Sequence, residues 1–376
     1  MALPADQKGT AARPATSGVV GGWYVTPKGD CIPAYIRSLR SGTTFLYKAL
    51  ADVLPVAYLR QYDLLNYSRL LAAYKAGTIP KEAAAMDEYW AAVGCTTRLL
   101  DNVGASHASA EEHGFMLMAH SRWCTNHLTA ATSQLFSQLC AKLVTVQECQ
   151  SGVVLMKNPC DYGLEAEILR LYPNAKFIHI QRDMTSCLSS MLRILDDVWP
   201  GVGGMDPWLH AMLTGGKYVA ALFIMLDLIA GQEQTMRQVA LNLVNTTPVL
   251  KAEAACAFAE IRAQEPHRVH ELTYEELMGD PQGAVQGIAT FLGLEPDAAQ
   301  LAQLGGRVEP RQTKPHPYIV DAMKARAAAK APQTGDWRNL AAWIIPSSYH
   351  IARRGVAPSG SFGTADFVSK LWDMGK

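Results

Sequence analysis

The sequence of 376 residues predicts an α/β fold in which a central parallel sheet is flanked by helices. Residues 34–36 form a short apolar segment, and apolar residues recur at helical spacing from Thr43 onward. Residues 152–156 are a continuous apolar run, typical of a parallel strand that is buried on both faces. Residues 175–181 form another such run, and a helical pattern follows directly. This order of strand, helix, strand, helix favours parallel strands with right-handed crossovers.

Composition limits the possible partners. Lys plus Arg equals Asp plus Glu at 34 each, so the chain as a whole is not attracted to nucleic acid or to anionic membranes. The 8 cysteines show neither a CxxC pair nor zinc-site spacing, which indicates reduced thiols of an intracellular, cytoplasmic protein. The most apolar run, 219–230, is too short to span a bilayer and contains Asp227, so it predicts a core helix.

We expect one domain over residues 23–354, after a disordered lead at 1–22 and before a loosely ordered tail at 355–376. The segment 58–63 is expected to be a connection, and the long region that follows, up to Gln150, a helical insertion. The other expected elements are a helix over 162–171 with Asp161 as its N-terminal cap, a helix capped by Thr185 or Ser186, helices within 217–264, a strand over 268–272 and a helix containing 288–292.

The turn between the first strand and the first helix has the features of an anion site. Free N–H groups and the helix dipole favour negative charge at a helix N-terminus, and Gly42 allows the backbone to approach an oxyanion. Thr43 and Thr44 add hydroxyl donors, and Arg40 adds a fixed positive charge. The Lys of nucleotide-hydrolysing P-loops is missing. The alternative is an ordinary turn with Ser and Thr caps.

Three cations follow three expected strands. Arg40, Lys157 and Arg182 would all lie at the carboxyl edge of the sheet, where ligands of α/β proteins bind. Three like charges repel one another unless a polyanion holds them together, so the sequence predicts a polyanionic ligand. The Gly-rich segment 199–210 has aromatic residues at both ends, which suits a mobile lid.

Four segments resemble, in the same order, the sulfotransferases that use 3′-phosphoadenosine 5′-phosphosulfate (PAPS). They are RSGTTF at 40–45, YPNAKFIHIQRD at 172–183, LTYEEL at 272–277 with its sequel to Leu294, and GDWRN at 335–339. The resemblance implies a P-loop NTPase-like sulfotransferase fold with helical insertions. It also implies that PAPS is the co-substrate and that no metal is required.

The resemblance assigns residues to the nucleotide. The residues implied for the 5′-phosphosulfate loop are Arg40, Ser41, Gly42, Thr43, Thr44 and Phe45. Phe45 would stack on adenine, although its register suits a core residue equally well. The residues implied elsewhere are Arg182 and Ser190 at the 3′-phosphate, Tyr274 near the adenine, and Lys330, Gly335, Asp336 and Trp337 in a loop that closes over the nucleotide.

The resemblance also suggests catalytic residues, namely Arg40 at the leaving oxygen and Lys157 at the bridging oxygen. One branch of the family has a catalytic His two residues after this Lys, and Pro159 stands there instead. The segment looks more like the tyrosylprotein branch, whose base is a carboxylate soon after the first helix. Asp63 is therefore the expected base and His120 the second candidate. A solvated turn Asp and an ordinary surface or core His are the alternatives.

We therefore expect a PAPS-dependent sulfotransferase that moves a sulfuryl group to a hydroxyl, less readily an amine, of a small molecule with an apolar or aromatic portion. A catalytically inactive protein of the same fold that binds nucleotide or a partner is the alternative. A kinase-like phosphotransferase is a third possibility, and the missing P-loop Lys counts against it.

Overall fold

The computed structural model describes residues 19–20, 23–24, 31–37, 42–98, 103–121, 126–159, 161, 163–198, 207–208, 230–307 and 314–328. Several expected features lie outside these residues: Arg40, Ser41, Lys330, Gly335, Asp336 and Trp337, nearly all of the lead, the whole tail, most of the lid segment and nearly all of the 219–230 run.

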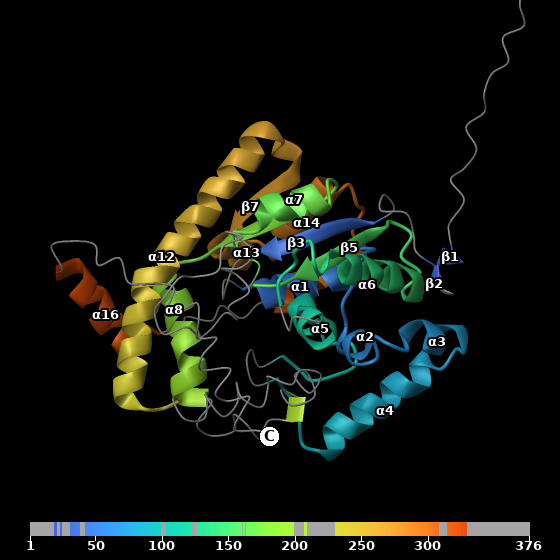
Figure 1. The fold of residues 1–376 in the computed structure, drawn as a ribbon, viewed down its shortest axis with the longest axis horizontal. Helices are drawn as coiled ribbons and strands as arrows, with labels where there is room; N and C mark the ends of the chain where they lie inside the picture. The colour runs from blue at the N-terminus through green and yellow to red at the C-terminus, as the bar shows by residue number, and fades with distance from the viewer. Residues whose placement is uncertain are drawn as a thin grey trace, which may run out of the picture.

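A five-stranded parallel sheet forms the centre of the described chain (Figure 1). Its strands are β3 (Ile32–Arg37), β4 (Ala57–Tyr58), β5 (Val153–Lys157), β6 (Lys176–Gln181) and β7 (Val269–Thr273). The spatial order is β4-β5-β3-β6-β7, so the earliest of these strands lies in the middle. A separate antiparallel pair joins β1 (Val19–Val20) and β2 (Trp23–Tyr24). The predicted parallel sheet is confirmed.

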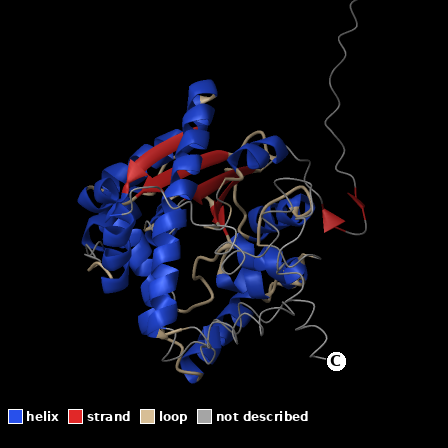
Figure 2. Cartoon of the chain, turned by 60° about the vertical axis from the view of Figure 1, so that its left-hand side comes forward, coloured by secondary structure: helices blue, strands red, loops and turns tan. Residues whose placement is uncertain are grey.

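Both faces of the sheet are buried, as the continuous apolar runs predict. Because side chains alternate along a strand, Tyr35 and Phe177 belong to one apolar cluster, and Ile36 and Ile178 to another. The first cluster includes apolar residues of α6 (Ser133–Val146), α7 (Glu165–Leu171) and α12 (Glu233–Gln264). The second includes those of α1 (Thr43–Val53) and α14 (Pro281–Leu292). Helices therefore cover both sides of the strands (Figure 2).

The helical insertion between β4 and β5 is also present. It contains α2 (Gln61–Leu65), α3 (Leu70–Lys75), α4 (Ile79–Ala92), α5 (His113–His120) and α6. The expected connection at 58–63 was wrong in part, since it contains the end of β4 and the first turn of α2. A two-residue strand and a five-residue helix are too short to give a readable period.

A helical layer extends beyond the far edge of the sheet. Leu188 of α8 (Met184–Arg193), Met236 of α12 and Ile319 of α16 (Pro317–Ala328) share one apolar cluster. The three helices lie at the left of Figure 1. The remaining elements are η1 (Ile194–Val198), η3 (Pro266–Arg268), α13 (Tyr274–Gly279), α15 (Ala298–Gln303) and η4 (Leu304–Arg307). No helix in the described part of the chain is both long and apolar enough to cross a membrane.

Two expected helix starts need correction. Helix α8 is capped by Asp183, whose carboxylate accepts hydrogen bonds from the backbone nitrogens of Thr185 at 3.3 Å and Ser186 at 2.7 Å. Those two residues are therefore in the first turn and are not the cap. Helix α7 begins at Glu165 instead of residue 162. A carboxylate suits the position at the start of α8, because the helix dipole favours negative charge there.

Candidate functional site

The turn between β3 and α1 requires glycine at residue 42. Its φ is 85°, in the left-handed region that side chains rarely adopt. A Cβ at Gly42 would also lie 2.7 Å from Cδ2 of Tyr274, so the ring of Tyr274 lies directly against this backbone. Helix α1 has neither an acidic residue in its first turn nor a side-chain cap. Its N-terminus therefore has the free donors and positive potential of an anion site.

The ring of Tyr274 connects this turn to the end of β6. Tyr274 is the first residue of α13, which a capping box between Thr273 and Glu276 fixes in place. The guanidinium carbon of Arg182 lies 3.9 Å from the centre of the Tyr274 ring, a cation–π contact. Gly42, Arg182 and Tyr274 come from three of the motifs in the sequence, and the fold brings them together.

Lys157 is the last residue of β5, and its side chain is buried between two partners. Its Nζ donates to Oγ1 of Thr44 at 2.8 Å, across to the first turn of α1. The same Nζ lies 2.8 Å from Oε1 of Glu112, at the N-terminal end of α5. The residue is only 5% exposed. The ammonium group is thus held where the carboxyl end of β5 meets the start of α1.

Two further residues that the resemblance implies for the nucleotide, Ser190 and Phe45, also lie in the described part of the chain. Ser190 lies half-buried on α8, in the helix that begins just after Arg182. Phe45 packs at the edge of the apolar cluster around α1, in agreement with the core alternative. Sequence reasoning missed Lys251, whose Nζ donates to the backbone oxygen of Arg182 at 3.2 Å. Lys251 lies within the long helix α12, and no strand or turn motif marks it.

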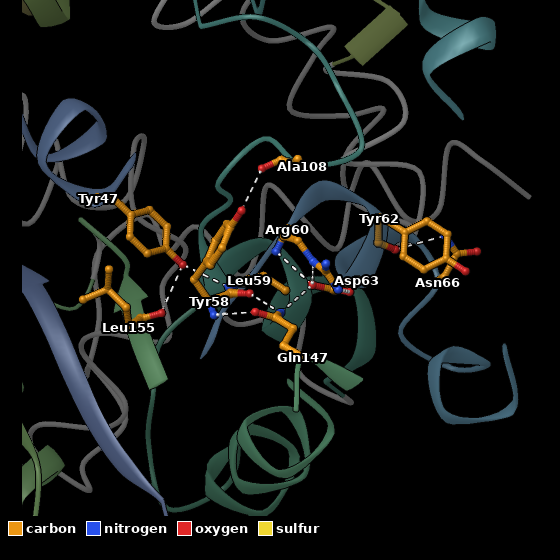
Figure 3. Close-up of polar contacts among 10 residues, drawn as sticks. All are labelled: Tyr47, Tyr58, Leu59, Arg60, Tyr62, Asp63, Asn66, Ala108, Gln147 and Leu155. Atoms are coloured by element: carbon orange, nitrogen blue, oxygen red, sulfur yellow. Dashed lines mark hydrogen bonds and ion pairs between the residues drawn. The ribbon is translucent and has the colours of Figure 1, made fainter. Parts of the chain in front are cut away.

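Asp63 does not have the surroundings of a catalytic base. It is completely buried, and its carboxylate accepts from Nε and Nη2 of Arg60 at 2.8 and 2.9 Å and from Nε2 of Gln147 at 3.1 Å (Figure 3). Burial raises the pKa of Asp63, and these hydrogen bonds oppose that shift. Gln147 also bonds both backbone polar groups of Tyr58. The structure thus favours a structural role for Asp63, which ties α2 to the segment after α6.

His120, the second candidate base, lies at the opposite end of α5 from Glu112. A helical rise of about 1.5 Å per residue separates the two by roughly 12 Å along the axis. The ring of His120 lies 4.8 Å from that of Tyr67, centre to centre. Partial burial and the charge of Lys142 lower the pKa of His120. The imidazole is therefore not at the end of β5.

Asp161, expected to be a helix cap, is instead a buried acceptor between two segments. Its carboxylate accepts from the backbone nitrogen of Leu128 at 3.0 Å and lies 3.0 Å from Nε2 of His113. Nδ1 of His127 lies 3.6 Å from Oδ1 of the same carboxylate. The side chain of Asn158 donates to the backbone oxygen of Asn126 at 2.7 Å. The loop after β5 is therefore fastened to the start of α5 and to residues 126–128.

Comparison with known proteins agrees with the motif resemblance. Residues 38–213 match the model of a family described as "Sulfotransferase family". This segment contains Gly42, Thr44, Lys157 and Arg182, and it ends before Tyr274. The resemblance to sulfotransferases is thus confirmed, and the α/β fold expected from it is confirmed as well. Among curated proteins, no sequence matches this chain.

Solved structures that resemble the chain include sulfotransferases. Sulfotransferase STF9 from Mycobacterium avium is 12% identical with a TM-score of 0.46, covering 88% of this chain and 79% of its own. STF1 from Mycobacterium tuberculosis H37Rv is 14% identical with a TM-score of 0.40, covering 73% and 71%. The sulfotransferase domain of the Synechococcus PCC 7002 olefin synthase is 18% identical with a TM-score of 0.30, covering 92% and 94%. These similarities are weak.

Proposed function

We propose that this chain, whose residues 38–213 match the sulfotransferase family, is an enzyme that transfers the sulfuryl group of PAPS to an acceptor hydroxyl. The observation that carries the proposal is the position of Lys157. Its buried Nζ reaches the first turn of α1 through Thr44 at the carboxyl edge of the parallel sheet, where ligands of such folds bind. A cation beside an uncapped helix N-terminus adds to the positive potential there, which suits an anionic ligand.

The residues fit a nucleotide that carries phosphate groups at the 3′ and 5′ positions of its ribose. The N-terminus of α1, with Gly42 and the hydroxyl of Thr44, would hold the 5′-phosphosulfate. Arg182 would pair with the 3′-phosphate, since guanidinium matches phosphate geometry. The ring of Tyr274 lies between these two positions, in contact with both, and would border the adenosine. Arg40, Ser41, Lys330 and residues 335–337 are proposed ligands on the family resemblance alone.

The proposed reaction needs positioning and charge stabilisation more than covalent chemistry, by analogy with phosphoryl transfer. The acceptor oxygen attacks sulfur in line with the bridging oxygen. As the new S–O bond forms, the old bond breaks and its electron pair stays on the phosphate, giving adenosine 3′,5′-bisphosphate. Lys157 would neutralise that oxygen, and a base would take the acceptor proton.

Other parts of the proposal rest on the sequence. We propose a cytoplasmic protein with one domain over residues 23–354 and a small-molecule acceptor that has an apolar or aromatic portion. An inactive protein of the same fold remains the alternative function. It would bind adenosine 3′,5′-bisphosphate and transfer nothing.

A direct test is to incubate the chain with PAPS and a set of hydroxylated metabolites, and to follow both sulfated products and adenosine 3′,5′-bisphosphate by mass spectrometry. We expect sulfated product from at least one acceptor, with nucleotide released in equal amount. Thermal shift with the bisphosphate serves as the control, because a ligand that binds only the native state raises the melting temperature. A thermal shift without any product would favour the inactive alternative, and no shift would contradict both.

A further inference from the structure

The proposed reaction needs a base other than Asp63, whose carboxylate is held by hydrogen bonds, and His120, which lies at the far end of α5. We infer that Glu112 is the general base that takes the proton of the acceptor hydroxyl. The inference rests on the proposed function and adds a residue that lies outside the four sequence motifs. It starts from the contact of Glu112 with Lys157 at 2.8 Å.

The ammonium group of Lys157 contacts both a hydroxyl of the anion site and the carboxylate of Glu112. Its Nζ lies 2.8 Å from Oγ1 of Thr44 and 2.8 Å from Oε1 of Glu112. The two oxygens therefore lie no further apart than the sum of these distances. In-line transfer requires a leaving oxygen, sulfur and an attacking oxygen in a row. With the leaving oxygen on the Thr44 side of Lys157, the attacking oxygen comes within reach of Glu112.

The carboxylate of Glu112 is not used to cap helix α5. Glu112 is the residue before α5, where a side chain commonly caps the helix, but it makes no capping hydrogen bond. Its side chain is 25% exposed, so an acceptor from solvent can reach it. A base must come within hydrogen-bond distance of the proton that it takes, and a partly exposed carboxylate allows an acceptor hydroxyl to approach it.

The neighbouring titratable groups are committed to other contacts. Glu111 is 1% exposed and pairs with Nη1 of Arg98 at 3.0 Å, and Nε1 of Trp208 donates to it at 3.3 Å. His113 is fully buried and pairs with Asp161 at 3.0 Å. Glu111 precedes Glu112 in the chain and His113 follows it, so these buried pairs anchor the chain on both sides of Glu112.

The proton balance of the step is complete. As the acceptor oxygen bonds to sulfur, its O–H bond breaks and the proton passes to a carboxylate oxygen of Glu112. The S–O bond to the phosphate breaks, and the electron pair stays on the phosphate oxygen next to Lys157. Glu112 then returns the proton to water. Lys157 lies beside Glu112 and beside Thr44 of the anion site, so it would stabilise the carboxylate before transfer and the phosphate oxygen after it.

The test measures kcat, KM and pH dependence of Glu112→Gln with PAPS and an active acceptor. We expect kcat to fall by about 100- to 10,000-fold while bisphosphate affinity by calorimetry stays near that of the wild type. The acid limb of the wild-type kcat profile should disappear. Glu88→Gln removes the same charge at an exposed position of α4 and should leave kcat unchanged. A kcat within about tenfold of wild type would overturn the inference.

A second variant distinguishes two roles of Glu112, that of a base and that of a counter-ion that only positions Lys157. Glu112→Asp keeps a carboxylate and shortens its reach, so it should recover part of kcat and keep the acid limb. If Glu112 only positioned Lys157, Glu112→Gln would keep the acid limb with a lowered kcat, and the inference would fail. It would fail equally if Glu112→Asp were no more active than Glu112→Gln. If the wild type itself gave no sulfated product, the proposed function would fail first.

Discussion

At the scale of single residues, Lys157 carries most of the proposed chemistry. Its ammonium is buried, and it contacts Thr44 on the donor side and Glu112 on the acceptor side. Charge that develops on the bridging oxygen exists only in the transition state, so Lys157 should contribute there more than in the ground state.

Replacing Lys157 by Ala should therefore lower kcat strongly, by about 100-fold or more, and leave bisphosphate affinity nearly intact. Steady-state kinetics with PAPS and calorimetry with the bisphosphate would measure the two effects. Lys81→Ala, at an exposed position on α4, is the matched control. Normal turnover at saturation together with a large loss of affinity would contradict this role.

Asp63 should behave as a structural residue. In Asp63→Asn the guanidinium of Arg60 no longer faces a negative charge. The amide also has one oxygen fewer to accept the hydrogen bonds from Arg60 and Gln147 (Figure 3). We expect the free energy of unfolding to fall by about 1–3 kcal/mol, while kcat stays within a fewfold of wild type. Urea denaturation and steady-state kinetics would check this. A stable variant with turnover reduced about 100-fold or more would restore Asp63 as the base.

Sequence reasoning identified the residues next to a strand or a turn but not their partners. Gly42, Lys157 and Arg182 each end or follow an apolar run, so their place at the sheet edge was predictable. Glu112 was missed because it follows no strand motif and lies about 45 residues before Lys157 in the chain. Its carboxylate reaches Lys157 only because α5 begins beside the end of β5, which is a tertiary property.

At the scale of elements, Glu82 connects three helices of the insertion between β4 and β5. Glu82 on α4 accepts hydrogen bonds from the hydroxyls of Thr78 at 2.7 Å and Tyr62 at 2.7 Å, and it pairs with Arg69. These contacts, led by the one from Thr78, lower the pKa of Glu82 to about 2. They join α2, α3 and α4 into one unit, which lies at the lower right of Figure 1.

The lowered pKa predicts how stability depends on pH. Because the folded pKa lies below the unfolded one, the ionised Glu82 stabilises the protein above about pH 4.5, and this contribution is lost as the pH falls toward about 2. Glu82→Gln should therefore be less stable than wild type near neutral pH, and the difference should shrink as the medium is acidified below about pH 4.5. Thermal unfolding across that range would measure it. A difference independent of pH would contradict the assignment.

The boundaries of four strands of the central sheet could be predicted from the sequence. Strands β3, β5, β6 and β7 were predicted within one or two residues, since each is an apolar run between turn signals. The start of α7 was misplaced, because Asp161 was expected to cap it and instead accepts from His113 and Leu128. A side chain that bonds across the fold looks the same in the sequence as one that bonds locally.

At the scale of the whole molecule, the order of the strands explains why distant motifs form one site. Strand β3 lies centrally, with β5 on one side and β6 on the other, so their carboxyl ends are neighbours (Figure 1). Strand β7 follows β6 and delivers Tyr274 to the same edge. This arrangement was predictable in outline, since four motifs in a fixed order resemble one family. The acceptor was not predictable, because no motif in the sequence specifies the molecule that would take the sulfuryl group.

We propose that the edge of the sheet binds a nucleotide with a 3′-phosphate. Calorimetric titration of the chain with adenosine 3′,5′-bisphosphate and with adenosine 5′-monophosphate, which lacks that phosphate, would test this site most directly. This measurement does not depend on the acceptor. Both ligands are titrated into wild type, Arg182→Ala and the exposed control Arg170→Ala on α7.

We expect wild type and Arg170→Ala to bind the bisphosphate at least about tenfold more tightly than the monophosphate, since a charge-assisted pair with Arg182 contributes about 1.5–3 kcal/mol. In Arg182→Ala the two affinities should become nearly equal, through weaker binding of the bisphosphate alone. Equal affinity of wild type for the two ligands, or equal weakening of both in Arg182→Ala, would contradict the proposal.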